Sequence, residues 1–227
     1  MNTDRYSRQQ ALVPARRLEG RRVTVIGVGA VGRQVALQLA SIGVGHLQLI
    51  DHDKVEESNI SSQGYREDDL GHHKVNCAAE ACGDINYKLA IEIFNTKFNP
   101  DIEHGETIFC CVDSMDVRKE IFEAVKDTCM FFIDGRMSAE TMRILTAYNE
   151  KTMAYYPTTL FPDSEAFQES CTAKTTIYCA NVIAGIMVGH FAKSLRDVPI
   201  ESDIQYNLLA NELTIIEGYG NERTQTL

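Results

Sequence analysis

The sequence predicts an α/β fold, namely a doubly wound, Rossmann-like, mostly parallel sheet with helices on both faces. Three observations support this prediction. Strand-like apolar runs alternate with helical patterns along most of the chain. The first strand-like run ends in a glycine-rich turn that leads directly into a helical pattern. The chain has 227 residues, 44% of them hydrophobic, which suits one domain with a sizeable core.

Each expected element follows from its local pattern. Short apolar runs bounded by turn residues indicate strands, and apolar residues spaced three and four apart indicate helices. The expected strands cover residues 22–26, 46–51, 90–96, 107–112, 130–134, 143–148 and 211–216. The expected helices cover residues 31–42, 74–82, 115–127 and 174–195. The segments 53–71 and 157–170 are expected to be loops.

The whole chain, residues 1–227, is expected to form one domain. Residues 1–20 would be a helical lead-in and residues 157–176 a loop that carries a candidate cysteine. Residues 177–227 would add a C-terminal helix and strand.

Composition disfavours several classes of partner. The net charge of −10, from 22 basic and 32 acidic residues, argues against nucleic acid. No apolar run approaches the roughly 20 residues that a membrane span needs, and the first residues are polar, unlike a signal peptide. The seven cysteines are irregularly spaced, which favours reduced thiols. We therefore expect a cytoplasmic protein with no membrane partner.

A glycine loop followed by an acidic residue predicts a nucleotide site. Gly27, Gly29, Ala30 and Gly32 lie between the first strand and the first helix. Small residues there let the backbone approach a phosphate, and the helix N-terminus favours an anion. Asp51, at the end of the second strand, is placed to accept ribose hydroxyls. These features alone also suit an NAD enzyme.

Two further residues indicate phosphate chemistry. Lys74 begins a helix, and Asp113 follows the strand over 107–112 at its carboxyl end. A lysine for phosphate charge and a carboxylate for Mg²⁺ suit a nucleoside triphosphate, whereas hydride transfer needs neither. The alternatives are a solvated lysine at a helix start and, for Asp113, an N-cap of the next helix.

Six motifs follow one another along the chain: Arg5–Gln9, the glycine loop, Asp51–Asp53, Val55-Glu56 with Ser58-Asn59, Gly71 with Lys74, and Cys111–Asp113. In order and spacing they resemble the motifs of the ThiF/MoeB/HesA family, the bacterial relatives of ubiquitin-activating enzymes. The resemblance covers about residues 5–135 and resumes at 171–173. The sequence lacks the paired zinc-binding cysteines of many members, so it resembles a minimal member.

The resemblance implies a homodimer that uses Mg-ATP to convert a C-terminal carboxylate into an acyl-adenylate, with release of pyrophosphate. The substrate would be a small ubiquitin-like or sulfur-carrier protein, usually ending in Gly-Gly. Asp113 would hold Mg²⁺, and Arg8 would reach across the dimer interface to the phosphates of the neighbouring site. The nucleotide would contact the glycine loop and Asp51, Asp53, Asn59, Gln63 and Lys74.

Cys171 matches the family cysteine that, in some members, receives the acyl group. It lies in a polar loop before a helix, with Lys174 nearby, which suits a nucleophile that could form a thioester. The alternative is an inert loop cysteine. The other six cysteines lie in apolar runs and are expected to be core thiols: Cys77, Cys82, Cys110, Cys111, Cys129 and Cys179.

The main departure from the family is Ser62, where an arginine usually precedes the residue that matches Gln63. Serine cannot replace that charge, so Arg66 and Arg136 are candidate substitutes. Three alternative functions stay open. The chain could adenylate a peptide, a small-molecule carboxylate or a modified RNA base; it could be a degenerate scaffold or half of a heterodimer; or it could be an NAD oxidoreductase.

Overall fold

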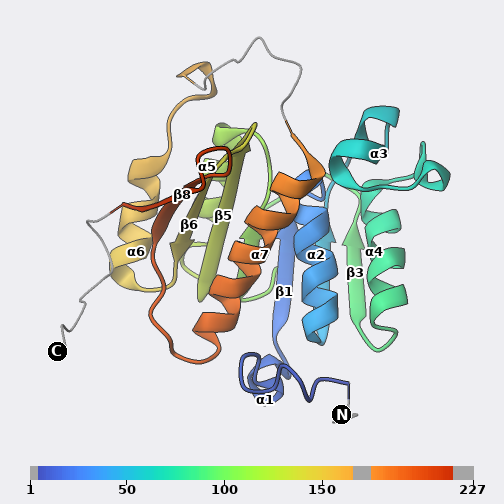
Figure 1. Cartoon of the computed structure of the whole chain (residues 1–227), viewed down its shortest axis with the longest axis horizontal. Helices are drawn as coiled ribbons and strands as arrows, with labels where there is room; N and C mark the ends of the chain where they lie inside the picture. Colours follow the sequence, from blue (N-terminus) through green and yellow to red (C-terminus); the bar gives the residue numbers. More distant parts are fainter. Residues whose placement is uncertain (1–4, 166–174, 217–227) are drawn as a thin grey trace.

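The computed structural model describes residues 5–165 and 175–216. They form an eight-stranded sheet with the order β3-β2-β1-β4-β5-β6-β7-β8 (Figure 1). The strands are β1 (Arg22–Ile26), β2 (His46–Ile50), β3 (Ala90–Phe94), β4 (Thr107–Cys110), β5 (Phe131–Ser138), β6 (Thr141–Ala147), β7 (Asp203–Asn207) and β8 (Glu212–Ile215).

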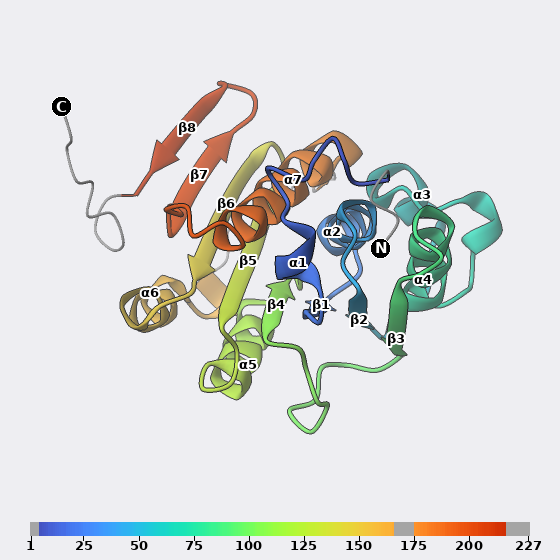
Figure 2. The same cartoon turned by 90° about the horizontal axis from the view of Figure 1, so that it is seen from below.

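Helices cover both faces of the sheet, as Figure 2 shows from below: α2, α4 and α7 lie on one face, and α5 and α6 on the other. The helices are α1 (Ala15–Leu18), α2 (Ala30–Ile42), α3 (Glu57–Gln63), α4 (Lys74–Ile85), α5 (Met115–Val125), α6 (Glu150–Tyr155) and α7 (Ile177–Ser194). Three 3-10 turns are η1 (Glu67–Asp69), η2 (Tyr156–Thr159) and η3 (Asp163–Glu165). The predicted doubly wound fold is confirmed.

The sheet is parallel from β3 to β5 and antiparallel from β5 to β8. The change of direction has a simple cause. Only Ala139 and Glu140 separate β5 from β6, and so short a connection can join strands only as an antiparallel hairpin. Ala139 has a φ of 50°, the left-handed conformation that tight turns require.

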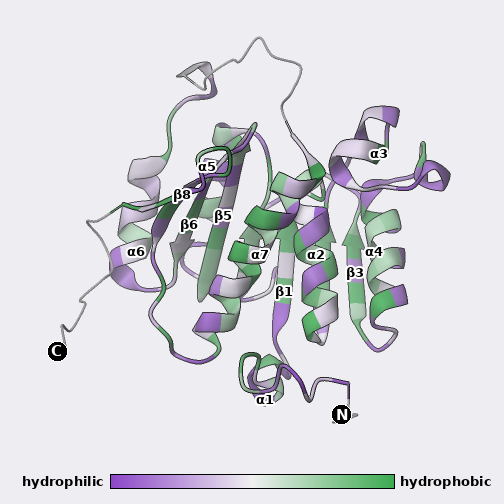
Figure 3. Cartoon of the chain, viewed as in Figure 1, coloured by the Kyte–Doolittle hydropathy of each residue, from purple (hydrophilic) through white to green (hydrophobic). Residues whose placement is uncertain are grey.

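Each face of the sheet has its own hydrophobic core. One core joins β1, β2 and β4 to α2, α4 and α7, and it includes the edge-to-face pair of Phe109 and Phe191, with ring centroids 5.9 Å apart. The other joins the opposite face to α5 and α6 through Phe122, Phe132 and Tyr156. Figure 3 shows the strongly hydrophobic α7 against the sheet. Among the described residues, no helix combines the length and hydropathy needed to cross a bilayer.

Three elements were missed. The segment 53–71 contains α3, which is polar and has no apolar periodicity; a capping box between Glu56 and Asn59 starts it instead. Likewise, α6 begins with a capping box between Asn149 and Thr152. The third missed element is β7, which carries a buried acidic residue, Asp203, and therefore does not look like a core strand.

The predicted helical lead-in over residues 1–20 is wrong for most of its described part. Residues 5–13 form turns, and only Ala15–Leu18 are helical. Pro14 precedes this helix and Gly20, with a φ of +80°, follows it, so it is confined to one turn. The segment is attached by Gln9 Nε2, which donates to Ile42 O at the end of α2 (2.7 Å).

The carboxyl end of β1 lies at the upper edge of the sheet in Figure 1, and β2 and β4 run parallel to β1 on either side of it. The lead-in lies at the opposite edge. Because neighbouring parallel strands end side by side, the turns after Ile26, Ile50 and Cys110 meet at one edge. Ligands of open α/β sheets bind at this edge.

Candidate nucleotide-binding site

The glycine loop is packed tightly at two positions and open at a third. A Cβ atom on Gly27, which has a φ of +83°, would lie 2.8 Å from Cys111 O, and one on Gly32 would lie 1.8 Å from Gly27 O. These glycines allow the loop to pack against β4 and against itself. A Cβ on Gly29 would meet only Gln63 Oε1, at 3.9 Å. Gly29 therefore leaves space beside the backbone, and Ala30 begins α2 directly after it.

Asp51 ties the glycine loop to the end of β2. Its Oδ2 accepts the Val28 N–H (2.6 Å) and its Oδ1 accepts the Asp53 N–H (2.7 Å). The carboxylate is buried, and each oxygen keeps a lone pair for a further donor. Asp51 is thus held rigidly beside the loop, as a ribose acceptor must be.

Lys74 is buried and its ammonium group is paired. Its Nζ lies 3.0 Å from Asp53 Oδ2, and Asp53 itself is half exposed. A solvated lysine at a helix start is therefore the wrong description. Tyr65, which the sequence did not indicate, links the same parts, because its hydroxyl donates to Val28 O (2.6 Å) and lies 3.4 Å from Lys74 O. Only the fold places this aromatic residue between the loop and α4.

Asn59 and Gln63 come from opposite ends of α3. Asn59 is buried, and its Oδ1 accepts the Glu56 N–H (3.0 Å), so it starts the helix. The Gln63 Oε1 atom is buried without a hydrogen-bond partner and is the atom nearest to the open side of Gly29. A buried oxygen with no donor is costly. Gln63 therefore faces the loop with an acceptor that a bound ligand could satisfy.

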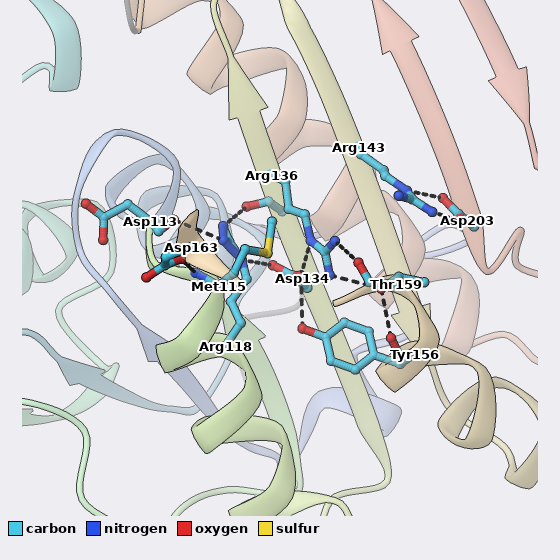
Figure 4. Close-up of polar contacts among 11 residues, drawn as sticks. Asp113, Met115, Arg118, Asp134, Arg136, Arg143, Tyr156, Thr159, Asp163 and Asp203 are labelled. Atoms are coloured by element: carbon cyan, nitrogen blue, oxygen red, sulfur yellow. Dashed lines mark hydrogen bonds and ion pairs between the residues drawn. The ribbon is translucent and has the colours of Figure 1, made fainter. Parts of the chain in front are cut away.

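Asp113 directly follows the turn after β4 and is exposed. It does not cap α5, because Ser114 is the N-cap and its Oγ accepts the Val117 N–H (3.2 Å). Asp163 reinforces this end of α5: its Oδ1 accepts the Met115 N–H (2.6 Å). The alternative of an N-cap role for Asp113 is therefore wrong. Its carboxylate remains available at the carboxyl edge (Figure 4).

Arg136, a predicted substitute for the arginine missing at position 62, is held in a buried network (Figure 4). Its Nε donates to Asp134 Oδ2 (2.7 Å), and its two Nη atoms donate to Thr159 O and Oγ1 (2.8 and 3.0 Å). Arg118 donates to the other oxygen of Asp134 (2.8 Å). Arg136 thus secures the turn after α6, and its role as a phosphate ligand stays a prediction without support from this geometry.

Arg66, the second predicted substitute, is half exposed and flanked by carboxylates. Its Nη2 lies 3.6 Å from Asp69 Oδ1 and 3.7 Å from Glu80 Oε1. These residues, with His72, line an open hollow of about 290 Å³. The carboxylates already offset the charge of Arg66.

One group of side chains could hold a cation within the described residues. Asp51, His52 and Asp53 place ligand atoms within 4.8 Å of one another. Both oxygens of Asp51 already accept backbone N–H groups, and Asp53 pairs with Lys74. The sequence assigned Mg²⁺ to Asp113, which is not part of this group.

The two remaining predicted residues lie away from this edge or outside the described chain. Arg8 is exposed in the lead-in at the opposite edge of the sheet. Cys171 lies outside the described residues. Of the other thiols, Cys82 and Cys110 have their pKa raised to about 12 by burial. Such thiols stay protonated and inert, as expected for core cysteines.

Comparison with known proteins identifies the family. The profile of the ThiF family matches residues 6–226. The chain belongs to the ThiF family. Among curated relatives of this ThiF-family chain, adenylyltransferase and sulfurtransferase MOCS3-1 of Zea mays is 31% identical over 70% of this chain and 36% of its own length. Ubiquitin-like modifier-activating enzyme 5 of Caenorhabditis briggsae is 26% identical over 83% of this chain and 50% of its own length.

The chain therefore spans half or less of the length of these curated relatives. Among solved structures, E. coli MccB with ATP resembles it with a TM-score of 0.73 and 18% identity, over 98% of this chain and 74% of MccB. That likeness shows a shared fold.

Proposed function

We propose that this ThiF-family chain is a cytoplasmic, ATP-dependent adenylyltransferase that activates a carboxylate. We further propose that the substrate is the C-terminal carboxylate of a small ubiquitin-like or sulfur-carrier protein, usually ending in Gly-Gly. The relatives named above support both parts, since one is an adenylyltransferase and the other activates a ubiquitin-like modifier.

One observation carries the proposal. The glycine loop, Asp51 and Lys74 meet at the carboxyl edge of the parallel strands, and the unpartnered oxygen of Gln63 faces Gly29 of the loop. A rigid acceptor for ribose, a buried ammonium group and an unsatisfied oxygen beside an open glycine are suited to a nucleotide. The structure of MccB with ATP supports the choice of ATP over NAD.

In the proposed reaction, a carboxylate oxygen attacks the α-phosphorus of ATP and the bond to pyrophosphate breaks. Two anions must approach each other, so positive charge has to be in place beforehand. Lys74 would supply part of it, with Asp53 fixing its Nζ at 3.0 Å. Asp51 would orient the ribose and so align the α-phosphate.

Asp113 fits a role as Mg²⁺ ligand because its carboxylate is exposed at the same edge and is not used to cap α5. Carboxylate oxygens are the ligands that Mg²⁺ prefers. Bound there, the ion would offset phosphate charge.

We also propose that the enzyme is a homodimer in which Arg8 completes the neighbouring site. Arg8 belongs to a segment attached to the carboxyl-terminal end of α2, at the edge opposite the glycine loop. It therefore lies far from the nucleotide site of its own chain, which favours a role across an interface. The Cys171 thiolate would then attack the carbonyl carbon of the acyl-adenylate, so that a thioester forms, the acyl–phosphate bond breaks and AMP leaves.

The first experiment is a calorimetric titration of the protein with Mg-ATP, with NAD as the control titrant. We expect binding of Mg-ATP that is lost in Asp113→Ala and Lys74→Ala, and no binding of NAD. With a carboxylate partner, both variants should also lose ATP–pyrophosphate exchange while keeping their fold, whereas Cys171→Ser should keep exchange. If wild-type protein binds no Mg-ATP, the catalytic proposal fails, and a scaffold or inactive half of a heterodimer becomes the better description.

A further inference from the structure

Arg33 is a buried cation to which the described residues offer no carboxylate partner. It lies in the first turn of α2, where its N–H donates to Gly29 O (3.0 Å). Its side chain is 8% exposed, and its Nε has no hydrogen-bond partner. It forms no ion pair with any carboxylate of residues 5–164 and 175–216. Nothing in its sequence context, the first turn of an apolar helix, indicates such an environment.

The surroundings of Arg33 place its charge beside the glycine loop. Its guanidinium carbon lies 4.9 Å from the centre of the Tyr65 ring, and the Tyr65 hydroxyl donates to Val28 O (2.6 Å). Burial raises the pKa of this hydroxyl, while the charge of Arg33 lowers it and that of Asp51 raises it further. The guanidinium and the Asp51 carboxylate therefore act on the same small region.

The guanidinium also lies at the end of α3. Its Nη1 is 3.3 Å from the position that a Cβ atom would take on Gly64, the residue after Gln63. Ser62 is on the same last turn of α3, and its Oγ donates to Ser58 O (2.6 Å), so its hydroxyl is satisfied by its own helix. Arg33 thus brings a positive charge to the end of α3, where Ser62 brings none.

A buried cation without an anion is costly, so the comparison with other buried cations is informative. Lys74 has Asp53, and Arg118 and Arg136 share Asp134. Within the part of the chain that the structure describes, Arg33 has only the face of the Tyr65 ring, a weaker partner than a carboxylate. The buried guanidinium of Arg33 is therefore suited to bind an anion that is not part of the chain.

We propose that Arg33 binds the polyphosphate chain of the nucleotide and supplies the positive charge that Ser62 does not provide. This inference rests on the proposed function, because it assumes that the ligand at the glycine loop carries phosphates. The chemistry matches, since a guanidinium at a helix N-terminus next to backbone N–H groups recognises phosphate oxygens. Arg33 is thereby a phosphate-binding residue, in place of Arg66 and Arg136.

The test uses Arg33→Met, which keeps the aliphatic bulk of the side chain, and Arg33→Lys, which keeps the charge. Titration calorimetry would measure binding of Mg-ATP, inorganic tripolyphosphate and adenosine. We expect Arg33→Met to weaken Mg-ATP and tripolyphosphate at least about tenfold and to leave adenosine unchanged, with Arg33→Lys in between. Arg66→Met is the matched control, and it should bind all three ligands as wild type does.

A second-site variant sharpens the test. Ser62→Arg in the Arg33→Met background would restore a guanidinium at the end of α3, and we expect it to recover most of the lost tripolyphosphate affinity. Equal weakening of ATP and adenosine in Arg33→Met, or no recovery in the double variant, would overturn the inference. Arg33-dependent tripolyphosphate binding without any ATP–pyrophosphate exchange would instead leave the inference standing and contradict the proposed function.

Discussion

Two regions of the same sheet edge differ in how completely their polar groups are satisfied. The region at the carboxyl ends of β1 and β2, with the start of α2, α3 and the start of α4, contains three of the four buried polar atoms without partners among the described residues: Arg33 Nε, Gln63 Oε1 and His73 Nδ1. In the region around β5 and β6, by contrast, the two oxygens of Asp134 accept bonds from Arg118, Arg136 and Tyr156. Arg143 and Asp203 form a further pair there (Figure 4).

This difference distinguishes a region suited to bind a ligand from a region that stabilises the fold. A region whose polar groups satisfy one another is rigid and gains little from a ligand. A region that leaves buried donors and acceptors unpaired is destabilised until something binds. Charged residues alone would not distinguish the two, because both contain buried cations at the same edge. The pattern of partners supports the proposed ligand site in the first region, and it gives the second region the role of holding the turn after α6.

The largest expected effect is on the Asp134 network. Asp134→Ala would leave Arg118 and Arg136 buried without a carboxylate, so we expect the free energy of unfolding to fall by about 3–5 kcal/mol. Denaturant unfolding measures it. The control is Glu123→Ala, which removes an exposed ion pair with Lys126 and should cost at most about 1 kcal/mol. Equal small losses in both variants would mean that the network does not support the fold.

Gly32→Ala tests whether the glycine loop is a packed structure. The added Cβ would overlap the carbonyl oxygen of Gly27, and neither backbone can move without shifting α2. We expect a loss of about 1–3 kcal/mol in unfolding free energy, together with loss of Mg-ATP binding in calorimetry. A variant of normal stability and normal ATP affinity would show that the close approach of Gly27 and Gly32 is not needed.

His190 makes the stability of the β5–β6 region depend on pH. It lies on α7 with Nδ1 2.9 Å from Thr146 Oγ1. Burial lowers its pKa from 6.5 to about 4, with Lys193 also lowering it and Glu201 opposing. Above pH 6.5 the contribution of neutral His190 to the free energy of unfolding is fully present. As the pH falls from 6.5 to 4, His190 becomes protonated in the unfolded chain but stays neutral in the folded chain. The free energy of unfolding therefore falls by up to about 1.4 kcal/mol per pH unit.

Denaturant unfolding between pH 4 and 7.5 measures this slope in wild type and in His190→Gln. The difference between the two slopes should lie within the window from pH 6.5 to pH 4. The exposed His72→Gln serves as the control for removing a histidine. Identical slopes in wild type and His190→Gln would show that His190 takes up its proton in the folded state as well.

The smallest expected effect is a gain in stability. Gly83 lies within α4, where a Cβ would meet no atom within 4 Å. Alanine loses less chain entropy than glycine in a helix, so Gly83→Ala should raise the unfolding free energy by about 0.5–1 kcal/mol. Thermal unfolding measures it, and Mg-ATP affinity should not change. A loss of stability would contradict the open environment of Gly83 and would also weaken the contrast with Gly32.

Much of the fold could be predicted because burial leaves a periodic trace in the sequence. The strands β1 to β6 and the helices α2, α4, α5 and α7 have apolar patterns that local reasoning recognises. The elements α3, α6 and β7 were missed because polar caps and an ion pair, rather than apolar periodicity, stabilise them. Each of these three elements is stabilised by polar side-chain contacts, which leave no periodic pattern of apolar residues in the sequence.

The candidate site divides in the same way. The positions of Gly27, Asp51 and Lys74 in the candidate site could be predicted, because backbone geometry and chain order restrict which residues can occupy a strand end or a helix start. The partner sets of Arg136, Arg66 and Arg33 could not, because each includes a residue from another element: Thr159, Glu80 and Tyr65. Sequence alone predicted Arg136 as a phosphate ligand, and the fold brought Thr159 to it beside Asp134 of the same strand.

The sequence by itself determined the alternating α/β architecture, the family and the order of the nucleotide motifs, since all three depend on local pattern and spacing. The tertiary structure alone decided which cations are already neutralised and which are not. Ion pairing depends on distances between residues far apart in the chain, such as Lys74 and Asp53 or Arg143 and Asp203. Those distances exist only after the helices and strands have packed.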